Sequence, residues 1–285
     1  MKVCALYVLY HPDWDYLFRS ISSLADSADA FYFYANSEIS EDKIQLLSSC
    51  ASSSMIIGSG DNVGIAAALN ELCRVAISEG FFWAITMDQD SLMPSGFVKE
   101  YIDFINKNES LHIGIVCPNF KLGDNSIVKK EEKYVELDKT ITSGACMNLK
   151  TFQEVGGFMD ELFIDSVDTE YSWKLHIAGY KIYRLLWLVL EHHIGQDPFD
   201  FSIFGKRLLT VDNHNYIRCY YITRNSLFLN KLYRKQLPRC VQNNRKALKL
   251  FIKVLLFEKD KKRKIRSIFW GVVDYKRNKL GKYNH

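Results

Sequence analysis

Short apolar runs alternate with helical patterns through the first half of the chain. The runs that are rich in aromatic and β-branched residues read as buried strands, at 3–10, 31–35, 55–57, 82–87 and 113–117. Because this alternation is typical of a parallel sheet with helices on both faces, we predict an α/β fold with a mostly parallel central sheet. Such sheets bind nucleotides at the carboxyl ends of their strands.

One helix is predicted between the third and fourth of these strands. Its apolar residues recur at helical spacing, namely Ile65, Leu69, Leu72 and Ala76. Asp61 or Asn62 stands where an N-terminal cap belongs, and Gly80 stands just past the end.

A second helix has Val167, Tyr171, Leu175 and Ala178 along one face. We expect Asp165 to cap it and Gly179 to end it, before a strand-like segment at 181–184. After about Tyr216 the pattern is helical to the end.

The net charge of +4 conceals an acidic body and a basic tail. From Lys231 onward there are 18 Lys and Arg against 3 Asp and Glu. We therefore predict a catalytic domain at 1–230 and a basic amphipathic helical extension at 231–285. At 48% hydrophobic and 25% charged residues, the composition is that of an ordinary globular protein.

The cysteines and the apolar segments bear on localisation. Seven cysteines without a CxxC pair argue against a disulfide framework or zinc cage and favour a reducing cytosol. The apolar start of the chain is interpreted as a buried strand rather than a signal peptide. No run of eighteen apolar residues occurs, so we expect no membrane span.

The first chemical motif is the acidic pair Asp88 and Asp90, directly after a buried apolar run. Two carboxylates one residue apart at a strand exit can hold a hard cation, Mg²⁺ or Mn²⁺, that also takes phosphate oxygens. Such a metal would neutralise charge on a departing nucleoside diphosphate. A solvated turn is the plainer alternative for a lone pair of this kind.

The second motif surrounds Asn62 and Gly64, at the start of the first predicted helix. Exposed backbone N–H groups at a helix start suit a phosphate or a polar base edge. A capped core helix would explain the same residues without a ligand.

The third motif places Asp165, Asp168 and Glu170 in the first turn of the second helix. The helix dipole alone favours carboxylates there. Asp168 could nevertheless take a proton from an attacking sugar hydroxyl, and Glu170 could hold an acceptor hydroxyl or a neighbouring loop.

The fourth motif is the pair His192 and His193, which follows the apolar run 185–190. A histidine at a strand exit can complete a metal shell begun by two aspartates, although a surface or core role is commoner.

Taken together and in chain order, these segments resemble the family-two glycosyltransferases, above all the bacterial rhamnosyltransferases that build O-antigens and capsules. The resemblance covers about residues 3–230. The residues that carry it are Asn62, Gly64, Asn70, 86–91, 143–146, 155–158, 163–171 with Gly179 and Tyr180, 192–195, and the segment YYITRN at 220–225.

The resemblance implies a GT-A-type fold, a nucleotide-sugar donor, a divalent metal and transfer that inverts the anomeric centre. Carried over by position, Asp88 and Asp90 hold the metal and diphosphate, Asp168 is the general base, and His192 or His193 is a further ligand. On the donor side the resemblance implies Asn36, Asn62, Gly64, Asp88 and Arg224. On the acceptor side it implies Ser143, Gly144, Gly157 and Glu170.

Two positions depart from the family pattern. Ala35 stands where an aspartate that grips the nucleobase is expected, so that Asn36 substitutes only in part. Tyr10-His11-Pro12 replaces the more familiar Tyr-Asn at the end of the first strand. We therefore rank L-rhamnose from dTDP-rhamnose first, and UDP-linked galactose, glucose or galactofuranose second.

The tail suggests where the acceptor lies. Two basic amphipathic stretches, 245–257 and 261–275, could lie in the headgroup layer of an anionic membrane or pack on the rest of the protein. We predict a peripheral enzyme on the cytoplasmic face of the inner membrane, with a lipid-pyrophosphate-linked saccharide as acceptor. Nucleic-acid binding is not expected, because no recognised motif accompanies the charge.

Two other classes of protein are weighed against a glycosyltransferase. A sugar nucleotidyltransferase would show a glycine-rich basic loop after its first strand, and Tyr10 to Trp14 offers none. A non-catalytic sugar- or nucleotide-binding module would keep the fold but would not need Asp168.

Overall fold

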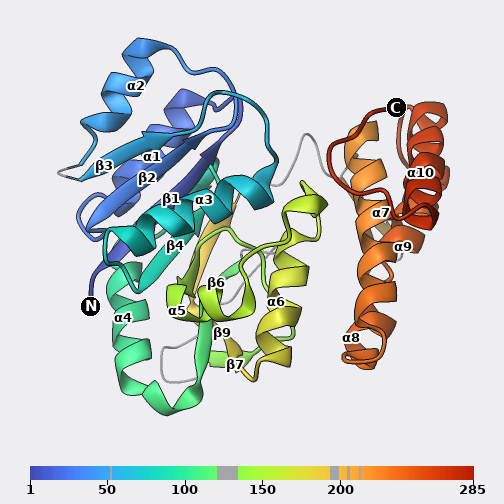
Figure 1. The fold of residues 1–285 in the computed structure, drawn as a ribbon. Helices are drawn as coiled ribbons and strands as arrows, with labels where there is room; N and C mark the ends of the chain where they lie inside the picture. Colours follow the sequence, from blue (N-terminus) through green and yellow to red (C-terminus); the bar gives the residue numbers. More distant parts are fainter. Residues whose placement is uncertain (52, 121–133, 193–198, 204–205, 212) are drawn as a thin grey trace. The chain divides into compact units, whose positions relative to one another are not determined.

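Figure 1 shows the computed structural model of the chain, which describes residues 1–51, 53–120, 134–192, 199–203, 206–211 and 213–285. The chain forms two compact units. The first unit comprises Met1–Asp160 and Asp168–His192, and the second comprises Glu161–Val167 and His193–His285. The chain therefore enters the second unit twice, once for a short segment that ends just before Asp168.

The first unit is built on a nine-stranded sheet with the order β3-β2-β1-β4-β8-β6-β9-β5, in which β7 also pairs with β9. The strands that share one direction are β1 (Val3–Leu9), β2 (Ala30–Ala35), β3 (Ser54–Ile57), β4 (Trp83–Met87), β6 (Ile113–Phe120) and β9 (Lys181–His192). The strands that run oppositely are β5 (Ser91–Leu92), β7 (Tyr134–Glu136) and β8 (Ala145–Asn148). The predicted mostly parallel sheet is confirmed.

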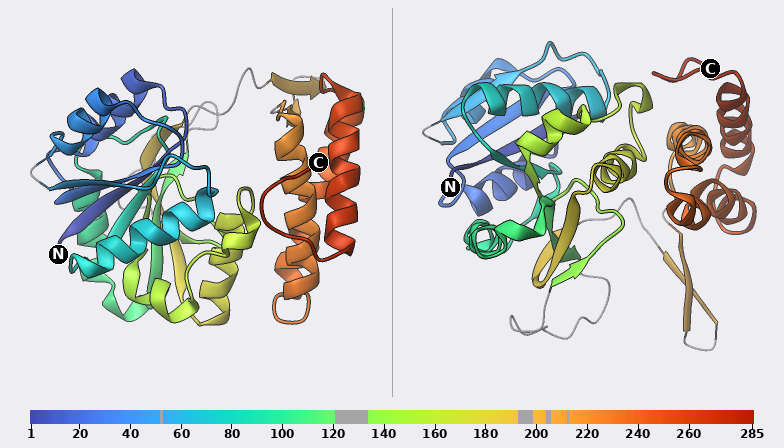
Figure 2. Two further views of the ribbon diagram at one scale, coloured as in Figure 1. Left: turned by 45° about the horizontal axis from the view of Figure 1, so that its top comes forward. Right: turned by 60° about the horizontal axis from the view of Figure 1, so that its bottom comes forward.

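Helices cover both faces of this sheet. They are α1 (Trp14–Leu24), α2 (Glu41–Ser48), α3 (Ile65–Ser78), α4 (Phe97–Lys107), α5 (Leu149–Val155) and α6 (Val167–Ile177). Figure 2 shows α1 and α4 on one face and α3 on the other. Both faces of β1 are buried, which explains its unbroken apolar sequence: Tyr7 belongs to the main core cluster, and Leu6 on the opposite face is also fully buried.

The second unit is mainly helical. It contains α7 (Tyr216–Tyr233), α8 (Pro238–Asn243), α9 (Lys246–Leu256) and α10 (Lys261–Lys276), with an antiparallel pair of strands, β10 (Phe199–Ile203) and β11 (Lys206–Val211). Helices α7 and α10 pack closely because Gly271 lacks a side chain: a Cβ there would lie 2.8 Å from the carbonyl oxygen of Tyr220.

The division into units differs from the predicted domains 1–230 and 231–285. Asn230 lies inside α7, so the change of charge does not mark the end of a compact body. The physical reason is that charge reports which residues face solvent, whereas packing defines a unit.

Two local predictions also need correction. Gly64, not Asp61 or Asn62, occupies the N-cap of α3 with a φ of 85°, because the Asn62 side chain instead accepts from the Gly64 N–H at 3.0 Å. The strand predicted at 181–184 continues through the apolar run 185–190, so that both belong to β9.

The two amphipathic stretches of the tail have different environments. On α9, Leu250 and Val254 pack inward, whereas Leu248, Phe251, Ile252, Leu255 and Leu256 are exposed. On α10, Ile268 lies in the same small core as Leu250, and Phe269 remains 60% exposed. Only α9 therefore keeps its apolar stripe facing solvent.

All seven cysteines carry free thiols. Across the part of the chain that the structure describes, no helix combines the length and apolarity that a bilayer crossing requires.

Candidate functional site

The carboxyl ends of β1, β2 and β4 meet at one edge of the sheet, which we call the donor edge (Tyr10, Asn36, Val63–Gly64 and Asp88–Asp90). Gln89, the residue between the two aspartates, joins two of these ends. Its Oε1 accepts from the N–H of Tyr10 at 3.0 Å, and its Nε2 donates to the Tyr10 carbonyl at 3.1 Å. Sequence reasoning missed Gln89, although its place between two predicted ligands was the available signal.

Asn36 joins the second strand to the loop before α3. Its side chain is 4% exposed, and its Oδ1 accepts from the Val63 N–H at 2.9 Å. The two donor-side motifs predicted separately, around Asn36 and around Asn62 and Gly64, are therefore one structure. Among the described residues no side chain caps α3, so its first turn retains N–H groups for an anionic ligand.

Asp88 and Asp90 lie partly exposed directly after β4. The turn is held by the Ser91 N–H, which donates to the Asp88 carbonyl at 3.2 Å. The next strand, β5, pairs with the end of β9 so that His192 lies opposite Ser91. The backbone therefore brings His192 beside the acidic turn, as the metal prediction requires, while His193 lies outside the described residues.

The metal prediction can be tested against the residues present. Two half-exposed carboxylates at a strand end fit Mg²⁺ or Mn²⁺, which take oxygen ligands and complete their shell with substrate phosphate and water. Within the described residues no group of three or more His, Cys, Asp and Glu side chains converges as a preformed metal cage. The fit of a metal therefore rests on the oxygen chemistry of the two aspartates.

Ser143 and Gly144 lie behind the acidic turn rather than at an open surface. The buried Ser143 hydroxyl donates to Ser91 Oγ at 2.8 Å, and the Gly144 N–H donates to the Thr86 carbonyl at 2.8 Å. The Gly144 carbonyl accepts from the Tyr101 hydroxyl, whose pKa is raised by burial. These contacts support the acidic turn, and the acceptor-side role of Ser143 and Gly144 stays a prediction.

Asp168 opens α6 and is partly exposed. Its Oδ1 accepts from the N–H of Thr169 at 2.7 Å, and with Thr142 and Ala145 it lines a cavity of about 10 Å³. Ala145 is paired with Thr86, whose hydroxyl donates to the Thr142 carbonyl at 2.5 Å. Thr142 and Ala145 thus lie beside both Asp168 and Thr86, which is two residues before Asp88.

Glu170 is fully buried and contacts a lysine on its own helix. Its carboxylate lies 3.2 Å from Lys174, and Lys174 also donates to the Gly157 carbonyl at 2.7 Å. Gly157 has a φ of 67°, and a Cβ there would lie 2.7 Å from Asn70 Oδ1. Gly157 also lines a cavity of about 430 Å³, and the acceptor-side roles of Glu170 and Gly157 stay predictions.

Arg224 is fully buried, and its guanidinium is turned to the interior of the second unit. It donates to the carbonyls of Gly281 at 2.6 Å and Leu162 at 3.1 Å, and to Asn225 Oδ1 at 2.9 Å. Its Tyr220 neighbour has a pKa raised to about 12 by burial and by a hydrogen bond to Asp274. These contacts occupy the guanidinium, and the nucleotide-binding role of Arg224 stays a prediction.

Asp165 likewise does not act as the predicted cap. Its carboxylate accepts from Arg218 Nη2 at 2.7 Å and from Arg218 Nε at 3.3 Å. Both carboxylate oxygens therefore accept from one guanidinium.

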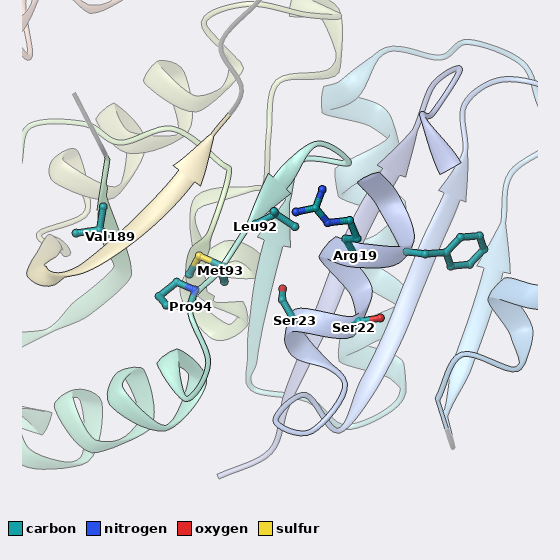
Figure 3. Close-up of a pocket in the computed structure, with 8 residues that line it drawn as sticks. Arg19, Ser22, Ser23, Leu92, Met93, Pro94 and Val189 are labelled. Carbon is teal, nitrogen blue, oxygen red and sulfur yellow. The ribbon is translucent and has the colours of Figure 1, made fainter. Parts of the chain in front are cut away.

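A separate cavity of about 670 Å³ lies between α1 and the residues around β5 (Figure 3). It is lined by Phe18, Arg19, Ser22, Ser23, Leu92, Met93, Pro94 and Val189. These lining residues include no carboxylate and no residue predicted for the site, so we do not assign the cavity to the donor.

Comparison with known proteins tests the interpretation. No protein-family model matches the chain. A dTDP-rhamnosyl transferase, RfbF of Shigella flexneri, is 30% identical over 185 residues, which span 60% of this chain and 60% of that protein.

Solved structures share the fold. TarS 1–349 of S. aureus in complex with UDP-GlcNAc superposes with a TM-score of 0.62 at 12% identity, covering 96% of this chain and 81% of TarS. GalNAc-T7 with UDP, GalNAc and Mn²⁺ gives a TM-score of 0.63 at 10% identity, covering 98% of this chain and 58% of GalNAc-T7. The chain has the GT-A fold.

These findings confirm the predicted resemblance to the family-two glycosyltransferases of GT-A fold. This chain matches less than two thirds of the length of RfbF. At 10–12% identity, the likeness to TarS and GalNAc-T7 shows a shared fold and nothing more.

Proposed function

We propose that the chain is a metal-dependent, inverting glycosyltransferase that moves L-rhamnose from dTDP-rhamnose to an acceptor alcohol. The observation that supports the proposal most is the donor edge. There Gln89 bonds to the end of β1 and Asn36 bonds to the loop before α3, beside an acidic turn. The similarity in sequence to a dTDP-rhamnosyl transferase favours this donor.

Two features of the donor edge would bind the donor, namely the acidic turn and the start of α3. Asp88 and Asp90 would hold the divalent cation, with His192 as a further ligand, and a bound metal would neutralise charge on the diphosphate. The N–H groups at the start of α3 would face a phosphate or the nucleoside. The Mn²⁺ in the GalNAc-T7 structure accords with a divalent metal.

Asp168 would act as the general base in a single displacement. The acceptor oxygen forms a bond to the anomeric carbon while the bond from that carbon to the diphosphate breaks. Asp168 takes the proton of the acceptor hydroxyl, and the nucleoside diphosphate leaves with the bonding electrons. Attack from the face opposite the leaving group inverts the anomeric centre.

A UDP-hexose is the second candidate donor. TarS was solved with UDP-GlcNAc and GalNAc-T7 with UDP, and both share the fold. The chain has Ala35 where an aspartate for the nucleobase is expected, and Asn36 already accepts from Val63 N–H. Thymidine and uridine nucleotides differ in the base methyl group and the ribose 2′-hydroxyl, so a contact to either group can decide between the two donors.

Thermal unfolding in the presence of one donor at a time tests the two candidate donors. dTDP-rhamnose with Mn²⁺ should raise the unfolding temperature more than UDP-galactose or UDP-glucose with Mn²⁺, because ligand binding to the folded state stabilises it. The shift should disappear in excess chelator. A larger shift with a UDP-hexose would select the second candidate, and no shift with any donor would contradict donor binding.

We further propose that the exposed face of α9 attaches the protein to an anionic membrane surface, where a lipid-pyrophosphate-linked acceptor would lie. Leu248 is 57% and Leu256 is 63% exposed, on a helix whose flanks carry Lys249 and Lys253. Apolar side chains beside lysines suit the boundary between headgroups and acyl chains. Assembly of O-antigen or capsule on the cytoplasmic face of the inner membrane stays a prediction.

Vesicle co-sedimentation tests the attachment. The double variant Leu248→Ser and Phe251→Ser should lower binding to vesicles of phosphatidylglycerol and phosphatidylethanolamine by about tenfold, because it removes two inserting side chains. Leu232→Ser, at an exposed position on α7, is the matched control and should bind like the parent protein. Equal binding by all three proteins would remove the membrane proposal.

A further inference from the structure

The segment that leads into Asp168 has an uncommon backbone. Phe163, Asp165 and Ser166 all have positive φ values, of 66°, 64° and 66°. Residues with a side chain rarely adopt this left-handed conformation, and such residues persist only where their surroundings over-determine them. Some part of the protein must therefore hold the segment in place.

Helix α7 holds the segment in place through one side-chain amide, that of Asn225. Asn225 Nδ2 lies 2.8 Å from the carbonyl oxygens of Ile164 and Asp165 and 2.9 Å from that of Leu162. Asn225 is fully buried, so water cannot replace these bonds. Arg224 adds a bond to the Leu162 carbonyl at 3.1 Å and orients Asn225 through its Oδ1.

Two side-chain contacts from the same helix complete the arrangement. Arg218 grips the Asp165 carboxylate through two nitrogens, the shorter bond being 2.7 Å. The Phe163 ring stacks on Tyr221, with centroids 5.4 Å apart and planes inclined by 10°. Each of these contacts from α7 to the segment thus reaches a residue that has a positive φ or is next to one that does. We call Arg218, Tyr221, Arg224 and Asn225 the α7 clamp.

The chain order gives the clamp its consequence. Residues Glu161–Val167 belong to the second unit, whereas Asp168 belongs to the first. The peptide bond between Val167 and Asp168 therefore joins the clamped segment to the start of α6. A change in the left-handed turn would be transmitted directly into the backbone of Asp168.

We propose that the α7 clamp positions Asp168 for proton abstraction. Arg218 and Asn225 are positioning residues, because their bonds go to the segment and not to a reacting atom. The inference rests on the proposed function, in which Asp168 is the base. The proposal also gives the YYITRN segment at 220–225 a positioning role, which differs from the donor-binding role predicted for Arg224.

The test compares Arg218→Ala and Asn225→Asp with the parent chain. Asn225→Asp keeps the size of the side chain and removes its donors, and Arg218 lies at the surface, so at least one variant should fold. Arg234→Ala, an exposed arginine at the end of the same helix, is the matched control. Hydrogen exchange of the amides at 161–170 reports on the segment, and rhamnosyl transfer from dTDP-rhamnose with Mn²⁺ reports on the base.

Faster exchange at 161–170, confined to the two clamp variants, is expected. Their kcat should fall about tenfold to 10²-fold, the cost of a small misplacement of a catalytic group, while the KM for dTDP-rhamnose stays near that of the parent. In an Asp165→Asn background the Arg218→Ala substitution should have little further effect, since the ion pair is already lost.

The outcomes separate the two proposals. Unchanged exchange at 161–170, or changed exchange with unchanged kcat, overturns the clamp whatever the donor is. A rise in KM alone also overturns it, because it would indicate a role in donor binding. If the parent chain transfers no sugar while exchange responds as expected, the proposed function fails and the structural hold stands.

Discussion

The chain has two acidic motifs that look alike in sequence and differ in structure. In the turn after β4, both aspartates stay partly exposed, and the intervening Gln89 is the residue that bonds to a neighbouring strand end. In the first turn of α6 and just before it, the three carboxylates have three different surroundings. Asp165 is paired with Arg218, Glu170 is buried beside Lys174, and Asp168 is partly exposed.

This difference shows how a carboxylate's surroundings limit its chemistry. A carboxylate that an arginine or lysine already holds contributes to the structure, and removing its partner is costly. A partly exposed one can still bind a cation or take a proton. A cation at the first motif and a base at the second stay predictions.

The largest effect is expected from Asp90→Ala. Removing one of two metal-binding carboxylates should abolish metal-dependent donor hydrolysis and sugar transfer, measured as release of nucleoside diphosphate from dTDP-rhamnose. Asp26→Ala, at an exposed aspartate far along the sequence, is the control. Full turnover by Asp90→Ala, or by the parent chain in excess chelator, would show that the first motif is only a turn.

A smaller effect is expected from Asp168→Asn. Transfer should fall by about 10²–10⁴-fold, the usual contribution of a positioned acid or base, and donor affinity should change little. Single-turnover transfer and equilibrium binding of dTDP-rhamnose measure the two quantities. If the affinity for dTDP-rhamnose is lost while the single-turnover rate is unchanged, Asp168 binds the donor. The two motifs would then have the same function.

The smallest effect on activity is expected at the buried carboxylate. Lys174→Ala should lower the free energy of unfolding by about 1–3 kcal/mol, because it leaves Glu170 and the Gly157 carbonyl without this partner in a buried place. Urea denaturation measures the change, and Lys150→Ala on the exposed side of α5 should remain within about 0.5 kcal/mol of the parent. Equal stability of both variants would mean that Glu170 is not held as the structure indicates.

Much of the fold could be predicted because it depends on local patterns. The aromatic and β-branched runs gave β1, β2, β3, β4 and β6 within a few residues, since strands buried on both faces read as continuous apolar segments. Gly80 and Gly179 were predicted just past helix ends, and both adopt the positive φ that such positions favour. The strands that run against the others were not predicted, because pairing partners are set by contacts far apart in sequence.

The candidate site could be predicted in part. Asp88 and Asp90 could be singled out as candidates because they follow a buried strand, and the strand register pairs His192 with Ser91. The roles of Ser143, Gly157, Glu170 and Arg224 could not be found in the same way. Burial and hydrogen-bond partners separate a supporting residue from a binding one, and those depend on the packed structure.

By itself, the sequence determined the α/β architecture, the acidic turn after β4, the candidate base at the start of α6 and the basic character of the tail. Each of these follows from residue types at short spacing. Only the tertiary structure decided which carboxylates are already paired, which apolar face of the tail stays exposed, and that α7 holds the segment before Asp168. These depend on residues from distant parts of the chain meeting in a dry interior, where every polar group needs a partner.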